Sequence, residues 1–158
     1  MVTNLLNRRN LIRQAGLGFL TLATAYSVPF AQAVPLPSIT AYRNPGCGCC
    51  ENWVAHLQAA GFQVTMHDDP DLDARRTAAG VPADIAGCHT AYMDEYVIEG
   101  HVPAEDILRF LNEKSHARGL AVAGMPMGSP GMETDGAPQK YDVMLFMADR
   151  SFRVYASH

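Results

Sequence analysis

The sequence has little positive charge. Twelve lysine and arginine residues stand against 16 aspartate and glutamate residues, which gives a formal net charge of -4 at pH 7. Proteins that bind nucleic acid or anionic membranes electrostatically carry basic patches, and this composition provides no such footprint. We therefore expect neither nucleic acid nor an anionic membrane surface among the partners.

The sequence also lacks a long, uninterrupted hydrophobic run. The stretch 15–30 is uncharged, but glycine, threonine, serine and Pro29 dilute it. A membrane-spanning helix needs about 20 consecutive apolar residues, so this stretch is short for a span. A membrane anchor is the alternative interpretation of a stretch that otherwise has the length of a signal-peptide core.

The flanks of this stretch favour an export signal. Arg8 and Arg9 precede it, and Ala31-Gln32-Ala33 follows it with the small-x-small pattern of a cleavage site. The paired arginines resemble a twin-arginine signal more than a Sec signal. We predict that residues 1–33 are an export signal and that residues 34–158 form a single periplasmic domain with no membrane span. Cleavage would leave 9 basic against 16 acidic residues, a net charge of -7.

Cysteine is scarce and clustered. Of four cysteines, Cys47, Cys49 and Cys50 lie within four residues, and Cys88 stands apart. In an oxidising compartment two structural disulfides are one interpretation. However, structural disulfides usually join distant segments, and three of these thiols lie within one helical turn. We therefore favour a functional site for metal binding or electron exchange.

The remaining chain alternates strands and helices, in a composition of 48% hydrophobic and 18% charged residues that suits one globular domain. Apolar periodicity and turn residues predict the following elements. They are strands at 39–43 and 62–67, a helix at 50–60, a helix at 70–79, a hairpin of 91–93 and 96–98, a helix from Pro103, a loop at 119–133, and a C-terminal hairpin of 141–147 and 152–155.

This order resembles the thioredoxin fold over residues 39–114, and it predicts an α/β protein with a mixed sheet flanked by helices. The cysteine-rich segment lies at the first strand-to-helix junction, where helix-start N–H groups lower the pKa of a thiol. In that fold the loop before the third strand passes beside this junction, so the resemblance implies that Cys88 approaches Cys47. His89 stands where thioredoxins have proline, which argues against ordinary disulfide exchange.

Methionines are concentrated in the predicted loop. Met125, Met127 and Met132 lie in a Gly- and Pro-rich segment without helical spacing. Thioethers bind Cu(I) without deprotonation, so this Met-rich loop is a candidate source of ligands. The alternative is that the methionines are adaptable core filler against the sheet.

The histidines receive different expectations. A one-residue offset on extended backbone points His89 away from Cys88, so we consider it both as a metal ligand and as a buried residue behind the ligands. We expect His101 at a sheet end distant from the cysteines, as a residue of the helix start. The others are expected at the surface: His56, His67, His116 and His158.

Several of these motifs together resemble the CopG-type periplasmic copper-resistance family. The resemblance covers nearly all of residues 34–158 and rests on the Cys47-x-Cys49-Cys50 motif, on Cys88-His89-Thr90, and on segments 99–103, 119–133 and 141–143. It implies a periplasmic, thioredoxin-like protein that binds copper through cysteines and contributes to copper resistance.

Chemistry supports copper as the metal. Cu(I) is soft and prefers thiolate sulfur in low coordination. Adjacent Cys49 and Cys50 do not readily chelate one ion together, which favours sulfurs that bridge more than one ion over a zinc-type site. We predict the ligands Cys47, Cys49, Cys50, Cys88, Met125, Met127, Met132 and His89. The partners are copper ions and other periplasmic copper-handling proteins.

A thiol-disulfide oxidoreductase is the alternative function. Cys47 and Cys50 have the two-residue spacing of a redox pair, and Cys50 or Cys88 could resolve a mixed disulfide. Cys49, Cys88 and the methionines are unnecessary for disulfide exchange but useful for a soft metal, so we favour copper binding.

Overall fold

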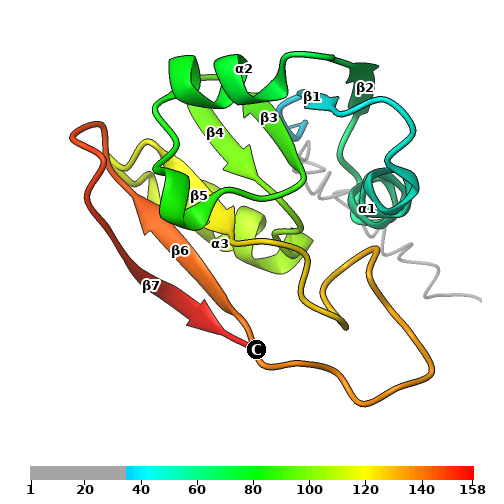
Figure 1. Cartoon of the computed structure of the whole chain (residues 1–158). Helices are drawn as coiled ribbons and strands as arrows, with labels where there is room; N and C mark the ends of the chain where they lie inside the picture. Colours follow the sequence, from blue (N-terminus) through cyan, green and yellow to red (C-terminus); the bar gives the residue numbers. More distant parts are fainter. Residues whose placement is uncertain (1–34) are drawn as a thin grey trace, which may run out of the picture. The chain divides into compact units, whose positions relative to one another are not determined.

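A mixed seven-stranded sheet organises residues 35–158, the part of the chain that the computed structural model describes (Figure 1). The strand order is β2-β1-β3-β4-β5-β6-β7, with β1/β2 and β4/β5 parallel and the other pairs antiparallel. The strands are β1 (Ile39–Arg43), β2 (Val64–Asp68), β3 (His89–Met93), β4 (Tyr96–Glu99), β5 (Gly119–Val122), β6 (Asp142–Phe146) and β7 (Phe152–Ser157).

Three α-helices flank this sheet in the described residues: α1 (Gly48–Ala59), α2 (Leu72–Ala79) and α3 (Ala104–Glu113). A short 3-10 turn, η1 (Ala83–Ile85), precedes β3. The predicted α/β class with a mixed, helix-flanked sheet is therefore confirmed. Residues 1–33, the predicted export signal, lie outside the described residues. Within 35–158, no helix combines the length and apolarity that a membrane crossing requires.

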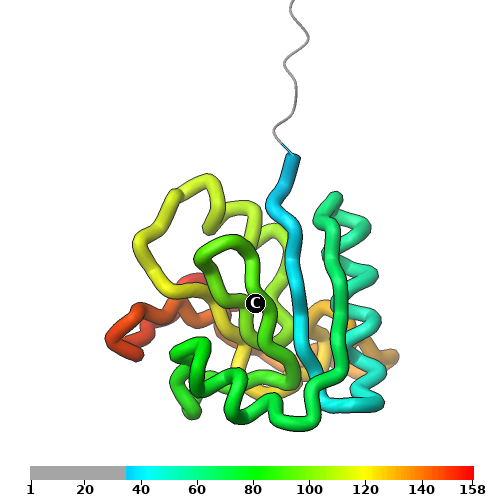
Figure 2. Tube along the Cα trace, turned by 90° about the horizontal axis from the view of Figure 1, so that it is seen from above, coloured from blue at the N-terminus to red at the C-terminus, as the bar shows by residue number. Residues whose placement is uncertain are grey.

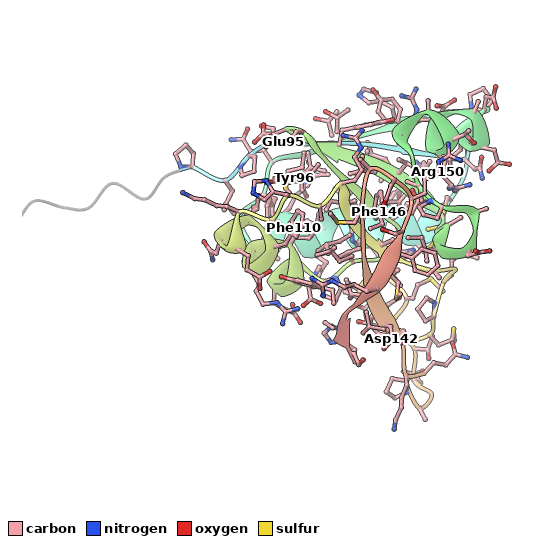
Figure 3. All side chains as sticks on the ribbon, turned by 90° about the vertical axis from the view of Figure 1, so that its left-hand side faces the viewer. Glu95, Tyr96, Phe110, Asp142, Phe146 and Arg150 are labelled. Atoms are coloured by element: carbon pink, nitrogen blue, oxygen red, sulfur yellow. The ribbon has the colours of Figure 1, made fainter. Side chains whose placement is uncertain are left out.

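The helices cover opposite faces of the sheet because neighbouring side chains of a strand point to opposite sides. Ile98 and Leu120 belong to the larger core, together with Trp53 of α1 and Phe110 of α3. Figure 3 labels Tyr96 and Phe110, whose rings meet edge to face with centroids 4.7 Å apart. The smaller core lies on the other face, where Ala79 of α2 joins Val97, Ala121 and Phe146.

The junction between β1 and α1 presents the cysteine-rich segment. Ile39 and Ala41 are buried on β1, and the chain then turns through Gly46 at φ +80° into α1. Cys47 is the N-cap residue, with extended dihedral angles and no side-chain capping bond. Figure 2 shows β1 and β2 side by side with α1 running along them. The first turn of α1 therefore emerges beside the end of the central strands.

One predicted loop is partly a strand. We expected a loop throughout 119–133, but residues 119–122 form β5, which is fully buried between β4 and β6. Gly119 looked like a loop residue, yet it is required in the strand because a Cβ there would collide with the backbone carbonyl of Val97. The prediction was wrong for these four residues, because Gly119 allows the backbones of β5 and β4 to approach closely and does not form a turn.

The predicted C-terminal hairpin is confirmed and extends the sheet. β6 and β7 pair antiparallel with an irregularity between Val143 and Met144. Figure 3 labels Asp142 and Phe146 at the two ends of β6 and Arg150 in the following turn, where its φ is +67°. The hairpin places β7 at the edge of the sheet.

Candidate metal centre

Four sulfurs converge at the start of α1. The Sγ atom of Cys50 lies 2.7 Å from that of Cys47 and 3.5 Å from that of Cys88. Cys49 Sγ lies 3.3 Å from Cys47 Sγ and 3.9 Å from Cys88 Sγ. We call Cys47, Cys49, Cys50 and Cys88 the cysteine cluster. All four thiols are free, so the alternative of two structural disulfides is not what the structure contains.

Helix geometry explains the convergence of the first three thiols. The N-cap position and the first turn of α1 hold Cys47, Cys49 and Cys50, so their side chains start from neighbouring points around the helix end. Arg43 reinforces this end, because its Nη1 donates to the Cys47 carbonyl oxygen at 2.7 Å. Cys50 is buried, whereas the other three cysteines are half-buried. Three of the four cysteines therefore keep partial exposure to solvent.

Cys88 connects the thiols to two imidazoles. It lies in the bend just before β3, and its Sγ is 2.8 Å from His101 Nε2 and 3.3 Å from His89 Nδ1. The two histidines and Cys88 form a second group of potential ligands whose donor atoms lie within 4.8 Å of one another. Cys88 thus belongs to both groups, and the site offers sulfur and nitrogen donors side by side.

The position of His101 corrects our expectation. We placed it at a distant sheet end, but it is fully buried against Cys88. The β3–β4 register pairs Thr90 with Glu99, and the same antiparallel register continued outward sets 88 opposite 101. The predicted hairpin contained this signal, since its turn at 94–95 already implies that pairing.

His101 is oriented as a ligand would be. Its Nδ1 lies 2.7 Å from the carbonyl oxygen of Pro130. A carbonyl only accepts, so Nδ1 carries the proton and Nε2 presents its lone pair to Cys88. A backbone carbonyl that fixes the imidazole tautomer is the usual support of a metal-binding histidine.

His89 also departs from its expected direction. We expected it to point away from Cys88, but Cys88 precedes the strand, so strand alternation does not apply to this pair. The His89 ring is fully buried, with its centroid 4.1 Å from that of Trp53 and 5.1 Å from that of His101. Its Nε2 has no hydrogen-bond partner in residues 35–158, so one buried ring nitrogen of His89 is unpaired in this part of the chain.

The thiols of the cluster differ in acidity. Burial acts to raise the pKa of Cys47, but hydrogen bonds from the Cys50 and Cys49 thiols outweigh it and leave this pKa below its usual value. Burial and the bond to Cys47 raise the pKa of Cys49 to about 11. The hydrogen bond to Cys88, followed by burial, raises the pKa of Cys50. Of the three thiols at the start of α1, Cys47 therefore ionises most readily, because hydrogen bonds from its neighbours stabilise its thiolate.

Burial favours the neutral form of both imidazoles. Burial, followed by the proximity of His101, holds the pKa of His89 well below its ordinary value. Burial likewise lowers the pKa of His101, although the Pro130 carbonyl opposes that shift. Neutral imidazole is the form that binds metal, so the site needs no proton loss from these two side chains.

The segment after β5 lies against the start of α1. In Figure 1 it leaves β5, passes beneath α1 and returns to β6. Asn52 Nδ2 donates to the Gly131 carbonyl oxygen at 3.5 Å, and a Cβ on Gly131 would lie 2.6 Å from the Trp53 backbone nitrogen. This contact, together with the Pro130–His101 bond, places residues 130–131 beside His101 and the first turn of α1.

The three methionines of this segment differ in their exposure to solvent. Met125 is 54% exposed and Met127 is 38% exposed, so the alternative of core filler is wrong for these two residues. Met132, which follows Gly131, is half-buried. Their role as ligands stays a prediction, since it depends on where the thioethers lie when metal is bound.

Comparisons with known proteins give a consistent result. The model of a family described as "Protein of unknown function, DUF411" matches residues 85–132. A solved structure described as "Copper resistance protein copG- Form 1" is 41% identical, with a TM-score of 0.73 over 78% of this chain and 98% of that chain. A second, "Copper resistance protein copG- Form 2", is 42% identical, with a TM-score of 0.74 over 79% and 99% of the two chains. A search of curated proteins found no match.

Proposed function

Because the chain belongs to the family of copG copper resistance proteins, we propose that it binds Cu(I) through the cysteine cluster in the periplasm and contributes to copper resistance. Both solved relatives are copper resistance proteins. The proposed export signal at residues 1–33 supports the periplasmic location.

One observation carries this proposal: four thiol sulfurs and a neutral imidazole nitrogen meet at Cys88. Each sulfur of the cluster lies within 3.9 Å of another, and His101 Nε2 lies 2.8 Å from Cys88 Sγ. Thiolate and imidazole are the donors that copper prefers, and thiolate selects its Cu(I) state. The residues present therefore fit copper as a bound cargo.

The same donor set suits more than one ion. Cys49 and Cys50 are consecutive, which disfavours chelation of one ion by both sulfurs, whereas a thiolate can bridge two Cu(I) ions. A structural zinc site would favour two separated pairs of ligands. We therefore propose several Cu(I) ions bridged by the cluster, with His101, His89 and the methionines as further ligands: Met125, Met127 and Met132.

The biological use follows from the exposure of the site. Three of the four cysteines are half-buried, so copper can be exchanged with solvent or with another protein. We propose sequestration, transfer to other periplasmic copper-handling proteins, or interconversion of Cu(I) and Cu(II) as the contribution to resistance.

The test is anaerobic titration of the reduced protein with Cu(I). Thiolate charge-transfer absorbance and competition with a chelator would give the stoichiometry and affinity. Cys47→Ser and Cys88→Ser should each lose most Cu(I) affinity while circular dichroism shows an unchanged fold. Unchanged stoichiometry in both variants would contradict the proposal.

Thiol-disulfide exchange is the second candidate function. The Cys47 and Cys50 sulfurs are 2.7 Å apart, and the pKa of Cys47 is lowered although burial opposes that shift. The order β2-β1-β3-β4, with α1 after β1, supports the thioredoxin-like interpretation. Two results together would favour this function. The protein would bind Cu(I) only weakly, and it would reduce a disulfide substrate in a reaction that the Cys47→Ser substitution abolishes.

A further inference from the structure

A buried ion pair lies behind the bend that carries Cys88. Arg76, in the last turn of α2, donates from Nε to Glu99 Oε1 at 2.7 Å. The Glu99 side chain is fully buried at the end of β4, and the Arg76 side chain is only 13% exposed. Neither side chain belongs to the metal centre, yet both are directed to the residue before Cys88.

The pair holds both backbone polar groups of Gly87. The Gly87 N–H donates to Glu99 Oε1 at 2.8 Å, and Arg76 Nη2 donates to the Gly87 carbonyl oxygen at 2.8 Å. On the far side of Cys88, the Thr90 hydroxyl donates to Glu99 Oε2 at 2.6 Å. Charged hydrogen bonds therefore fix the chain on both sides of Cys88-His89.

Backbone packing limits the bend from the other direction. A Cβ on Gly87 would lie 2.5 Å from Gly100 Cα, and Gly124 N donates to the Ala86 carbonyl oxygen at 2.8 Å. The His89 carbonyl oxygen accepts from Gly100 N at 2.8 Å. These contacts position the backbone around Cys88, but only the Arg76–Glu99 pair holds both polar groups of Gly87.

The energetics favour a positioning role. A buried ion pair seldom adds stability compared with well-packed apolar side chains of similar volume, because desolvation offsets the attraction. Its hydrogen bonds are nevertheless strongly directional. We propose that Arg76 and Glu99 are positioning residues, which fix the Cys88 sulfur against the other three sulfurs of the cluster and against His101. For copper, this inference rests on the proposed function.

The first experiment measures sulfur proximity without copper. In a Cys47→Ser, Cys50→Ser background, Cys49 and Cys88 can form one disulfide as two protein thiols are oxidised and one glutathione disulfide is reduced to two glutathione molecules. The equilibrium gives the effective concentration of Cys88 at Cys49. Arg76→Met should lower it by about tenfold or more, because a displaced Cys88 loses much of its effective concentration.

Arg75→Met is the matched control. Arg75 lies on the same helix, pairs with Asp69 and covers the Tyr42 ring, without a hydrogen bond to 86–90. It should leave the Cys49–Cys88 equilibrium unchanged. In the otherwise native protein, Arg76→Met should also lower Cu(I) affinity, and Arg75→Met should not.

The double variant Arg76→Met, Glu99→Leu separates positioning from stability. Removal of both charges should restore folding stability but not the Cys49–Cys88 effective concentration or the Cu(I) affinity. The inference would be overturned if the double variant recovered folding stability, effective concentration and Cu(I) affinity together. It would also be overturned if folded Arg76→Met kept an unchanged effective concentration. If the native protein fails to bind Cu(I), the proposed function fails, while the glutathione equilibrium still decides the positioning role.

Discussion

A glycine-to-alanine substitution at Gly131 tests the contact between the segment after β5 and α1. Gly131 has φ +86°, and an added Cβ would lie 2.6 Å from the Trp53 backbone nitrogen and 2.8 Å from the Cys49 carbonyl oxygen. Both neighbours are helix backbone atoms, which cannot rotate away. The segment must therefore lift from α1, or the helix must shift, when alanine is introduced.

The expected magnitude has two parts. Alanine at positive φ costs about 1–2 kcal/mol, and overpacking against a fixed neighbour costs about a further 1–3 kcal/mol. Gly124→Ala supplies the matched control, because Gly124 has φ +65° and its added Cβ would meet nothing within 4 Å. We therefore expect Gly131→Ala to be the more destabilising variant by about 1–3 kcal/mol.

The assay is chemical denaturation of both metal-free variants, with Cu(I) affinity measured in parallel. Gly131→Ala should also weaken Cu(I) binding, because the adjacent Pro130 carbonyl orients His101. Equal free energies of unfolding and equal Cu(I) affinities for the two variants would refute the reasoning. A loss confined to affinity would mean that the segment detaches instead of straining the helix.

Three further predictions concern the ligands. His101→Phe should lower Cu(I) affinity by about tenfold or more, whereas His67→Phe at the exposed β2 surface should not. Equal losses of affinity in the two variants would contradict a ligand role for His101. Replacement by leucine of the three methionines should weaken copper retention or transfer, with stability changed by less than about 1.5 kcal/mol; unchanged affinity and transfer rate would exclude a ligand role for Met125, Met127 and Met132. Burial raises the pKa of Cys49 to about 11, and the bond to Cys88 raises that of Cys50, so both thiols hold protons at neutral pH. Binding of Cu(I) as proposed would displace these protons, so affinity measured by chelator competition should rise about tenfold per pH unit for each proton lost; no slope between pH 6 and 8 would contradict this.

Local patterns were enough to predict much of the fold. Period-2 and period-3.6 apolar residues indicated six of the strands and all three α-helices in the described residues, and the β1-to-α1 junction was located correctly. The approach of Cys88 followed from the resemblance to the thioredoxin fold, and the structure brings its sulfur within 3.9 Å of Cys49. These features depend on short-range sequence signals or on a known chain path.

Features that depend on neighbours distant in sequence were missed. β5 is four residues long and begins with a glycine required by the Val97 carbonyl, so no local pattern distinguished it from a loop. His101 reaches Cys88 through hairpin register, and the support of Pro130 comes from 29 residues further along the chain. No sequence pattern predicted the Arg76–Glu99 pair, because charged residues such as Arg76 on a short helix usually face solvent.

The single tryptophan of the chain gives the metal centre a native optical reporter. Trp53 contacts His89 with ring centroids 4.1 Å apart, and its indole nitrogen donates to the Val102 carbonyl oxygen at 3.0 Å. Emission from this indole should therefore be quenched as metal enters the site. Changes in emission intensity would then report metal loading and release in real time in the unlabelled protein.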